Sequence, residues 1–240
     1  MKISFIIPFH NEENIAVLML QRVIGFGKTQ HWDFEVIAVN DRSTDSTKQI
    51  IDRFAEKYPN IHPVHLEGRK DLGNTMGKAL KAGTKEAKGK IVIWTMGDMS
   101  DDTKTYKDIV EKINQGYDMV FGSRYMPGGS RGNLNALKAF LSSKGTLLAR
   151  ILFSVHSHDI TNAFRGFKKY VFDNLELTAN SFDISPEFAI KAHFKGYKLA
   201  EVPTVYTNRE KGVPKFKLWK MTIAYLKTYW KLMIKKYLPK

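Results

Sequence analysis

Two aspartate-bearing loops, each directly after an apolar run, constrain the fold of this chain more than any other feature of its sequence. Residues 34–39 lead into the loop 40–45, and residues 90–95 lead into the loop 97–102. Short apolar runs bounded by polar turn residues are typical of buried strands. In an open parallel sheet, the loops at the carboxyl ends of the strands line the ligand crevice. Carboxylates placed there can hold a nucleobase, a ribose or a hard metal ion that carries a diphosphate.

Strands and helices alternate through the first half of the sequence. We expect strands at residues 1–8, 34–39, 61–66, 90–95 and 117–122, and helices at residues 11–25, 45–58, 74–87 and 104–115. This order predicts the α/β class, with a Rossmann-like, mostly parallel sheet flanked by helices on both faces.

The second half is less regular. We expect a flexible glycine-rich loop at residues 125–133, helices at 135–153 and 186–194, a short mixed segment at 159–170 and a strand at 197–205. Val213 and Pro214 interrupt the pattern before a basic tail. We therefore predict one large domain at residues 1–212 and a C-terminal amphipathic basic helix at residues 213–240.

Composition excludes several classes of protein. Hydrophobic residues make up 43% of the 240 residues, which indicates a globular chain and not a disordered one. Without cysteine, the chain has no disulfides and no thiolate metal site. Residues 1–8 fit a first strand better than a signal peptide, and no apolar run reaches the roughly 18 residues that span a bilayer.

The positive charge is concentrated near the C-terminus. The formal net charge is +14, and residues 211–240 contribute nine lysines, no arginine and no acidic residue, which leaves +5 for the preceding residues. A protein wrapped in nucleic acid is expected to carry its basic residues over a whole binding face. The distribution therefore argues against nucleic acid as a partner.

The lysines of the tail fall on one side of the predicted helix. At about 100° per residue, one arc holds lysines 217, 220, 227, 231 and 235, and the opposite arc holds Trp219, Ile223, Leu226, Trp230, Met233 and Tyr237. This arrangement is typical of a helix in a membrane interface, where each lysine near an anionic surface contributes on the order of 1 kcal/mol. Alternatively, the apolar arc packs on the domain, or packs near Trp219 and contacts a membrane further along.

Polar residues also follow the first predicted strand. Asn11 could cap the next helix while Glu12 and Glu13 complement its dipole, which would be a purely structural role. A functional role is favoured because two further strand ends carry acids. Asp41 could accept a hydrogen bond from a base or a ribose, whereas Asp45 fits a helix cap better.

Asp98 is the strongest candidate for a metal ligand. Magnesium and manganese prefer oxygen ligands and often take one or two carboxylates together with substrate phosphates. Asp101 and Asp102 could instead begin the helix near Lys104, and we assign that structural role to Asp102.

Two cationic segments lie just past predicted strand ends, at Arg124 and in the basic loop 209–215. A planar guanidinium suits phosphate oxygens. A solvated surface position, the usual environment of arginine and lysine, is the alternative for both segments.

Together these segments resemble the inverting family 2 glycosyltransferases of the GT-A fold, and most of all the dolichyl-phosphate or polyprenyl-phosphate sugar synthases. Residues 6–12 (IIPFHNE) are similar to the family's opening, and residues 39–47 (VNDRSTDST) to its acidic element. Residues 122–125 (GSRY) match a third motif, and Arg209, Gly212 and Lys215 fit a fourth pattern, R-x-x-G-x-x-K. The resemblance covers nearly the whole chain before the tail.

The resemblance implies a role for each motif. At the donor it implies Pro8, His10, Glu12, Val39, Asp41, Gly97, Asp98, Arg209 and Lys215. It implies Asp98 and Ser100 as ligands of Mg²⁺ or Mn²⁺, and Arg124 and Ser143 at the acceptor. The catalytic residues would be Asp98, Arg124 and Arg209.

The chain also departs from the family's pattern. Met96 replaces the first acid of the usual D-x-D motif, and a thioether is a poor ligand for a hard cation. This favours weaker metal binding, recruitment of Asp101, or greater reliance on the donor phosphates. Asn40 and Arg42 replace residues that are often acidic, and the segment that should carry a second acceptor-side arginine offers Lys138 and Lys144.

The leading hypothesis is an inverting glycosyltransferase that uses a GDP- or UDP-sugar and a polyprenyl phosphate or other lipid-linked acceptor. It would be cytoplasmic and peripheral, held on an anionic membrane surface through residues 213–240. A second hypothesis is transfer to a sugar hydroxyl, which needs a base such as Asp101, Asp159, Asp183 or Glu187. The minor alternatives are a non-catalytic binding module and a degenerate transferase that binds the donor but turns over poorly.

Overall fold

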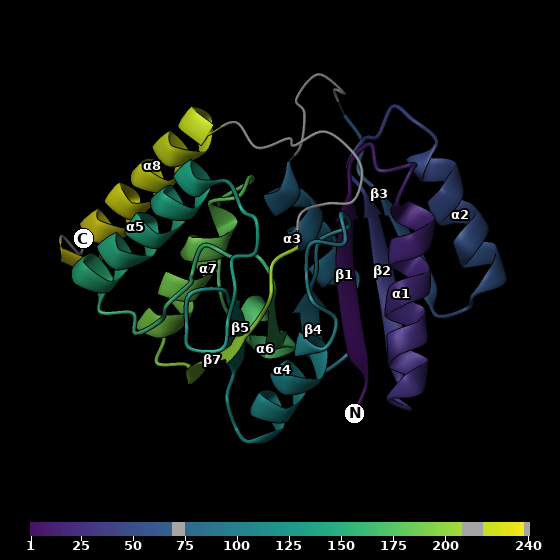
Figure 1. Cartoon of the computed structure of the whole chain (residues 1–240), viewed down its shortest axis with the longest axis horizontal. Coiled ribbons are helices and arrows are strands. Elements are labelled where there is room, and N and C mark those ends of the chain that lie inside the picture. The colour runs from purple at the N-terminus through teal and green to yellow at the C-terminus, as the bar shows by residue number, and fades with distance from the viewer. Residues whose placement is uncertain (69–74, 208–217, 238–240) are drawn as a thin grey trace.

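The computed structural model describes residues 1–68, 75–207 and 218–237 (Figure 1). Its strands are β1 (Ile3–Phe9), β2 (Phe34–Asn40), β3 (Ile61–His65), β4 (Ile91–Trp94), β5 (Met119–Ser123), β6 (Arg165–Lys168) and β7 (Leu199–Pro203). They form one sheet in the order β3-β2-β1-β4-β6-β5-β7. Every neighbouring pair is parallel except the two pairs that β6 makes, with β4 and with β5. The predicted mostly parallel sheet is confirmed.

Helices cover both faces of the sheet, so the molecule has three layers (Figure 1). On one face lie α1 (Ala16–Thr29), α2 (Thr47–Lys57) and α4 (Thr105–Asn114). On the other lie α3 (Met76–Glu86), α5 (Ala136–Phe153), α6 (Lys169–Asp173), α7 (Ile184–Phe194) and α8 (Leu218–Tyr237). Successive strand residues alternate between the two cores. Phe5 and Ile7 of β1 enter one core, and Ile6 enters the other.

The sequence prediction missed β6 in the segment 159–170. Only four residues long, β6 runs antiparallel between two strands that would otherwise be neighbours in a parallel sheet. Its Arg165 is fully buried, with the guanidinium carbon 5.0 Å from the ring centroid of Phe121. A charged residue in so short a segment conceals the apolar pattern by which buried strands are recognised.

The first predicted helix begins later than expected. Asn11 does not cap it, because α1 starts at Ala16 and Asn11 adopts a left-handed conformation with φ of 51°. The side-chain oxygen of Asn11 accepts a hydrogen bond from the Thr44 amide at 2.7 Å instead. Asn11 therefore ties the loop after β1 to the loop after β2.

The C-terminal helix shares the core of the domain. The predicted boundary at residue 212 lies outside the described residues, but α8 packs against α5 and α7. Met221, Tyr229 and Leu232 are buried at this contact. The expected packing near Trp219 is wrong for that side chain, which is 77% exposed.

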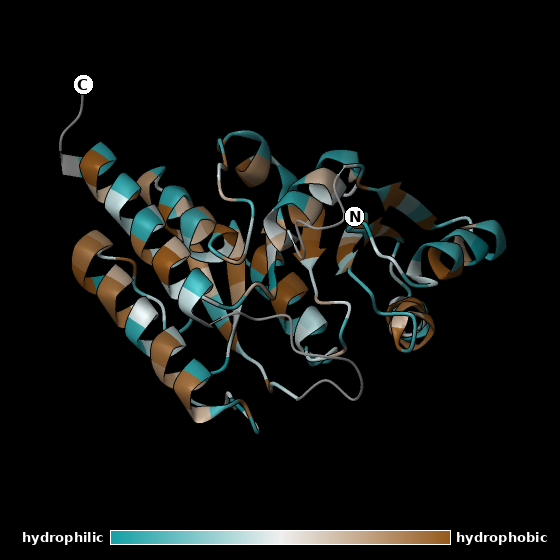
Figure 2. Ribbon diagram, turned by 90° about the horizontal axis from the view of Figure 1, so that it is seen from above, coloured by the Kyte–Doolittle hydropathy of each residue, from teal (hydrophilic) through white to brown (hydrophobic). Residues whose placement is uncertain are grey.

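Many large apolar side chains of α5 and α8 are exposed. These helices lie side by side in both ribbon views (Figures 1 and 2). Nine of their large apolar side chains are at least 40% exposed: Leu137, Phe140, Leu147, Ile151, Trp219, Ile223, Leu226, Trp230 and Ile234. None of the helices in the described segments is long and apolar enough to cross a membrane.

Candidate active site

The strand order reverses beside β1, where β2 lies on one side and β4 on the other. Such a reversal opens a crevice between the loops that leave the carboxyl ends of the strands. Gly97 lets these loops meet, because a Cβ atom at that position would lie 2.7 Å from the carbonyl oxygen of Pro8. The absence of a side chain at Gly97 therefore allows the Asp98 loop to pack against the end of β1.

A cavity of about 850 Å³ occupies this crevice. Eight of the predicted site residues line it: Pro8, His10, Glu12, Asp41, Gly97, Asp98, Ser100 and Arg124. Two of the predicted site residues, Val39 and Ser143, do not line the cavity. Val39 lies in the hydrophobic core, and Ser143 donates to the Phe140 carbonyl on α5. Arg209 and Lys215 lie outside the described residues.

Asp41 is the centre of a buried polar network at one end of the cavity. Its Oδ1 accepts from Nη2 of Arg42 at 2.6 Å, and its Oδ2 accepts from the Thr75 amide at 2.5 Å. Nη2 of Arg42 also donates to Oγ1 of Thr75 at 2.6 Å. Nδ1 of His10 lies 2.6 Å from the Asp41 carbonyl oxygen. The network fixes the carboxylate, because Asp41 is 1% exposed, Arg42 donates to Oδ1, and Thr75 donates to Oδ2.

Asp98 and Ser100 supply oxygen atoms at the floor of the crevice. Oδ1 of Asp98 accepts from the Ser100 amide at 3.1 Å, which shapes the loop. Within the described residues, no three Asp, Glu, His or Cys side chains gather as a metal-binding cluster. A carboxylate with a neighbouring hydroxyl fits Mg²⁺ or Mn²⁺ when substrate phosphates provide the remaining oxygens. Asp98 and Ser100 thus fit a metal ion that binds together with the phosphates of a substrate.

Asp101 lies below Asp98 and is nearly buried. Its Oδ2 accepts from the Met96 amide at 2.8 Å and from Oγ1 of Thr95 at 3.1 Å. Burial, with a smaller effect from the charge of Asp98, raises the pKa of Asp101 to about 7. Asp102 accepts from the Lys104 amide at 3.0 Å at the start of α4, in agreement with its predicted structural role.

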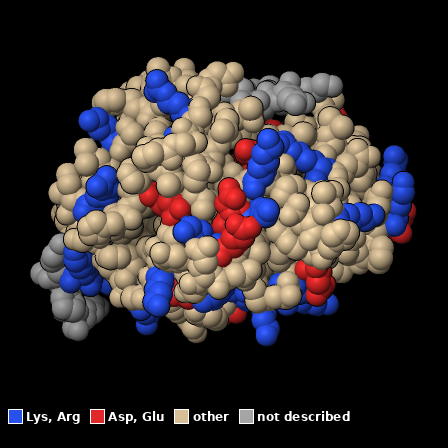
Figure 3. All heavy atoms as spheres, turned by 60° about the horizontal axis from the view of Figure 1, so that its bottom comes forward, with Lys and Arg blue, Asp and Glu red and all other residues tan. Residues whose placement is uncertain are grey.

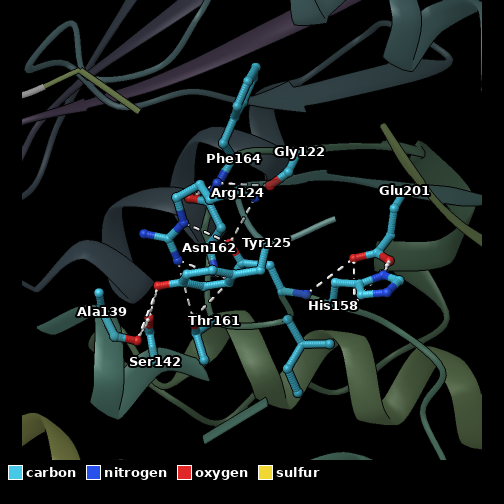
Figure 4. Close-up of polar contacts among 12 residues, drawn as sticks. Gly122, Arg124, Tyr125, Ala139, Ser142, His158, Thr161, Asn162, Phe164 and Glu201 are labelled. Atoms are coloured by element: carbon cyan, nitrogen blue, oxygen red, sulfur yellow. Dashed lines mark hydrogen bonds and ion pairs between the residues drawn. The ribbon is translucent and has the colours of Figure 1, made fainter. Parts of the chain in front are cut away.

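Arg124 projects from the end of β5 toward the other half of the cavity (Figure 4). Nε and Nη2 of Arg124 donate to the two carboxylate oxygens of Asp159, at 2.6 and 2.9 Å. Burial opposes the charge of the guanidinium, but the Asp159 carboxylate outweighs it and raises the pKa of Arg124. Arg124 is therefore a permanent, oriented cation in the wall of the cavity.

Hydrogen bonds made by Arg165 and Asn162 hold the loop that carries Asp159 in place. Arg165 donates to the carbonyl oxygens of Ile160 and Ser185, at 3.2 and 2.8 Å. The side chain of Asn162 donates to the Gly122 carbonyl at 2.9 Å, which joins this loop to β5 (Figure 4). The sequence suggested Asp159 only as a base. Its pairing with Arg124 was not predicted, because the antiparallel strand β6 brings the loop before it to the end of β5.

Helices α5 and α8 form the wall opposite the carboxylates. The lining contributed by α5 includes Lys138, Leu141, Ser142, Lys144, Gly145 and Leu148, and that of α8 includes Met221, Thr222, Tyr225, Leu226 and Tyr229. The hydroxyl of Tyr229 donates to the Gly145 carbonyl at 3.0 Å and joins the helices. The amphipathic pattern of this tail was predicted from its sequence, but its place beside the cavity was not.

Comparison with known proteins agrees with this geometry. A family model described as glycosyl transferase family 2 matches residues 4–176. The chain belongs to this family. Its resemblance to the lipid-phosphate sugar synthases is confirmed by two relatives. A dolichol-phosphate mannosyltransferase of Pyrococcus furiosus is 29% identical over 97% of this chain and 64% of its own length. A polyprenol monophosphomannose synthase of Mycolicibacterium smegmatis is 28% identical over 88% of this chain and 79% of its own length.

Two solved structures share the fold. A glucosyl-3-phosphoglycerate synthase from Mycobacterium tuberculosis, in complex with phosphoglyceric acid, has a TM-score of 0.70 at 17% identity over 96% of this chain and 79% of its own. S. aureus TarS, in complex with UDP-GlcNAc, has a TM-score of 0.65 at 20% identity over all of this chain and 68% of its own. The predicted GT-A fold is thereby confirmed. The chain spans about two thirds of the length of the P. furiosus relative.

Proposed function

We propose that this chain is an inverting glycosyltransferase that moves a sugar from a nucleotide-diphosphate sugar to a polyprenyl phosphate. One observation carries the proposal: a single cavity joins a carboxylate-lined end to an end walled by Arg124 and two partly apolar helices. The first end suits a metal-bound diphosphate, and the second suits a phosphate attached to an apolar chain. The names of the two sequence relatives support the same substrate class.

At the donor end, the loops after β1, β2 and β4 surround the nucleotide. Asp98 and Ser100 would hold Mg²⁺ or Mn²⁺ together with the diphosphate, and the cation neutralises charge on the departing nucleoside diphosphate. Pro8, His10 and Glu12 would contact the base and ribose. Because the oxygens of Asp41 are occupied by Arg42 and Thr75, its proposed contact with the donor requires sharing these bonds. Arg209 and Lys215 keep their proposed role over the diphosphate.

At the acceptor end, Arg124 would bind and orient the acceptor phosphate. Asp159 occupies Nε and Nη2, which leaves Nη1 without a partner among the described residues. The acceptor phosphate is already ionised, so its oxygen can attack the anomeric carbon without a general base. The carbon–oxygen bond to the diphosphate breaks as the new bond forms on the opposite face. Placement and charge neutralisation then supply most of the catalysis.

A lipid acceptor requires the cavity to meet a membrane surface, and α5 and α8 fit that requirement. The arc of α8 with Trp219, Ile223, Leu226 and Trp230 is exposed and not packed on the domain. Lys220, Lys227, Lys231 and Lys235 are exposed beside it. Aromatic and aliphatic side chains next to lysines favour the interface of an anionic bilayer. We propose a peripheral position on the cytoplasmic face of a membrane.

Transfer to a sugar hydroxyl is the second candidate. Of the four carboxylates considered as a base, only Asp101 lines the cavity within the described part of the chain. Asp159 pairs with Arg124, and Asp183 accepts from Oγ1 of Thr228 at 2.9 Å. Glu187 accepts from Lys191 and from the amides of Thr178 and Ala179. The hydroxyl reaction therefore depends on Asp101 alone among these four.

A nucleic-acid-binding module is the least favoured reading. On the face in Figure 3, acidic side chains lie among the basic ones, and no continuous basic stripe crosses it. A nucleic acid bound on that face would need such a stripe.

The deciding experiment is turnover by the full chain with GDP- and UDP-sugars, with Mn²⁺ or Mg²⁺, and with or without polyprenyl phosphate. Release of nucleoside diphosphate that needs both metal and lipid phosphate is the expected result. The variant Asp101→Asn separates the two candidates, because it should abolish transfer only if a hydroxyl must be deprotonated. Donor binding without lipid-dependent turnover would contradict the phosphate acceptor.

A further inference from the structure

The hydroxyl of Tyr125 reaches helix α5. It donates to the Ala139 carbonyl at 3.3 Å and shares a short hydrogen bond with Oγ of Ser142 (Figure 4). Each hydroxyl has one proton, so Ser142 donates to Tyr125 when Tyr125 donates to Ala139; Oγ of Ser142 lies 3.1 Å from the same carbonyl oxygen. A side chain directly after β5 is thus fastened to the first turns of the helix that walls the cavity.

The ring of Tyr125 supports Arg124. The guanidinium carbon lies 5.3 Å from the ring centroid, within the range of a cation–π contact (Figure 4). Asp159 fixes the same guanidinium through two hydrogen bonds. Nη2 of Arg124 also donates to Oγ1 of Thr161 at 3.3 Å. Of these three supports, the Tyr125 ring is the one whose own side chain is hydrogen-bonded to α5.

The outer side of α5 carries apolar side chains that are exposed. Phe140 is 55% exposed and Leu137 is 54% exposed, and both are in the same first turns as Ala139 and Ser142. A contact made by these exposed side chains therefore acts on the part of α5 to which Tyr125 is hydrogen-bonded.

We propose that Tyr125 is a positioning residue that couples helix α5 to the acceptor-side cation Arg124. Packing or a lipid surface fixes the position of α5. The hydrogen bonds of the Tyr125 hydroxyl to α5 then fix the position of the ring, and the ring fixes the position of the Arg124 guanidinium. This inference rests on the proposed function, because it assigns Arg124 to the acceptor. It adds a residue that touches neither donor nor acceptor and that none of the sequence motifs assigns to a role.

The test is a double-mutant cycle with Tyr125→Phe and Ser142→Ala, in which KM is measured for donor and acceptor separately. Phenylalanine keeps the ring under Arg124 and removes only the hydroxyl. We expect each variant to raise KM for polyprenyl phosphate about threefold to tenfold, the range that loss of one hydrogen bond gives. The donor KM should not change. The double variant should lose no more than Tyr125→Phe alone, because Tyr125→Phe already removes both contacts of the hydroxyl, with Ala139 and with Ser142.

Two controls separate positioning from a general loss of structure. Tyr170→Phe removes the hydroxyl that donates to Oδ1 of Asp118 at 2.5 Å, away from the cavity, and should leave both KM values unchanged. Hydrogen exchange of the α5 amides at residues 137–143 should rise in Tyr125→Phe and in Ser142→Ala, but not in Tyr170→Phe.

The outcomes distinguish this inference from the proposed function. If the wild-type chain transfers no sugar to polyprenyl phosphate, the proposed function fails, while the exchange experiment still tests the link to α5. If exchange in α5 does not change, or if donor and acceptor KM rise together, Tyr125 does not couple the helix to Arg124.

Discussion

The donor end and the acceptor end of the cavity are built in different ways. Loops that follow β1, β2 and β4 form the donor end, and each loop stays close to the strand that precedes it. The acceptor end combines Arg124, Asn162 and the two helices α5 and α8, which are distant in sequence. Polar networks fix the donor end, where Asp41 is 1% exposed, whereas Trp230 beside the acceptor end is 61% exposed.

This difference separates two physical tasks. A saturated buried network is pre-organised, so the donor end costs little reorganisation when charge develops on the diphosphate. The acceptor end keeps a buried ion pair inside and an apolar surface outside, which suits a ligand with a charged head and an apolar chain. The predictions below test whether the two ends respond separately.

Asp159→Asn should produce the largest effect, on stability. It leaves the Arg124 guanidinium buried without its carboxylate, which typically costs about 3–5 kcal/mol. Urea unfolding monitored by tryptophan fluorescence would measure the loss. The control is Asp52→Asn, since the Asp52 carboxylate is 36% exposed and its pair with Lys48 should be worth less than about 1 kcal/mol. Equal losses in both variants would contradict a special role for the acceptor-side pair.

Asp98→Asn should reduce donor turnover by about a hundredfold, because it weakens charge neutralisation at the diphosphate. Turnover at saturating Mn²⁺ would show the loss, and removal of the metal with a chelator should have little further effect on this variant. Asp102→Asn is the matched control, because the asparagine oxygen can still accept from the Lys104 amide, and its turnover should stay near that of the wild type. A metal dependence that survives Asp98→Asn would mean that the ligand lies elsewhere.

Lys227→Ala with Lys231→Ala should weaken binding to vesicles that contain anionic lipid. At about 1 kcal/mol for each lysine, the affinity should fall roughly 30-fold. Sedimentation with vesicles at low and high salt would measure it, and the wild-type affinity should fall with added salt. Replacing Lys48 and Lys107, which are more than half exposed on α2 and α4, removes the same charge and should have little effect. Equal losses in both pairs would place membrane contact outside α5 and α8.

Glu35→Gln should give the smallest effect, and one that depends on pH. Glu35 is 1% exposed and accepts from Ser4, from the Lys88 amide and from Lys2. Burial alone would raise its pKa, but these partners outweigh burial and lower the pKa from 4.5. The unfolded chain therefore takes up the proton first as the pH falls below about 4.5, so the contribution to stability is present at pH 7 and is lost in acid.

We expect Glu35→Gln to lower the free energy of unfolding by roughly 1 kcal/mol at pH 7. The difference in stability between the variant and the wild type should become smaller as the pH falls toward 3. Unfolding in urea at pH 7, 5 and 3 would measure it. The activity of the variant at pH 7 should match that of the wild type, because Glu35 does not line the cavity. An unchanged difference across this range would show that the ionised carboxylate is not what stabilises the strand.

Sequence patterns predicted the donor end well because its residues follow strands. Asp98 and Asp41 could be placed at one edge of the sheet from the order of strands and helices alone, and both line the cavity. The patterns did not show that the carboxylate oxygens of Asp41 accept hydrogen bonds from Arg42 and Thr75. Those hydrogen bonds depend on the approach of α3 to the end of β2, which is a tertiary contact.

The acceptor end was less predictable. Arg124 was identified from its position after β5, but its partner Asp159 lies 35 residues away and reaches it through the antiparallel strand β6. The amphipathic pattern of α8 left open whether its apolar arc is packed or exposed. The structure decided this, because a third arc, with Met221, Tyr229 and Leu232, makes the packing contact.

Local sequence patterns were enough to predict the α/β class, the strand ends that carry carboxylates and the basic amphipathic helix. These follow from local periodicity and from the geometry of parallel strands, in which residues after each strand share one edge of the sheet. The pairing of Asp159 with Arg124, the contact of Tyr125 with α5, and the place of α8 in the cavity wall became visible only in the folded chain. Such contacts depend on how separate segments pack together, and no local pattern encodes that packing.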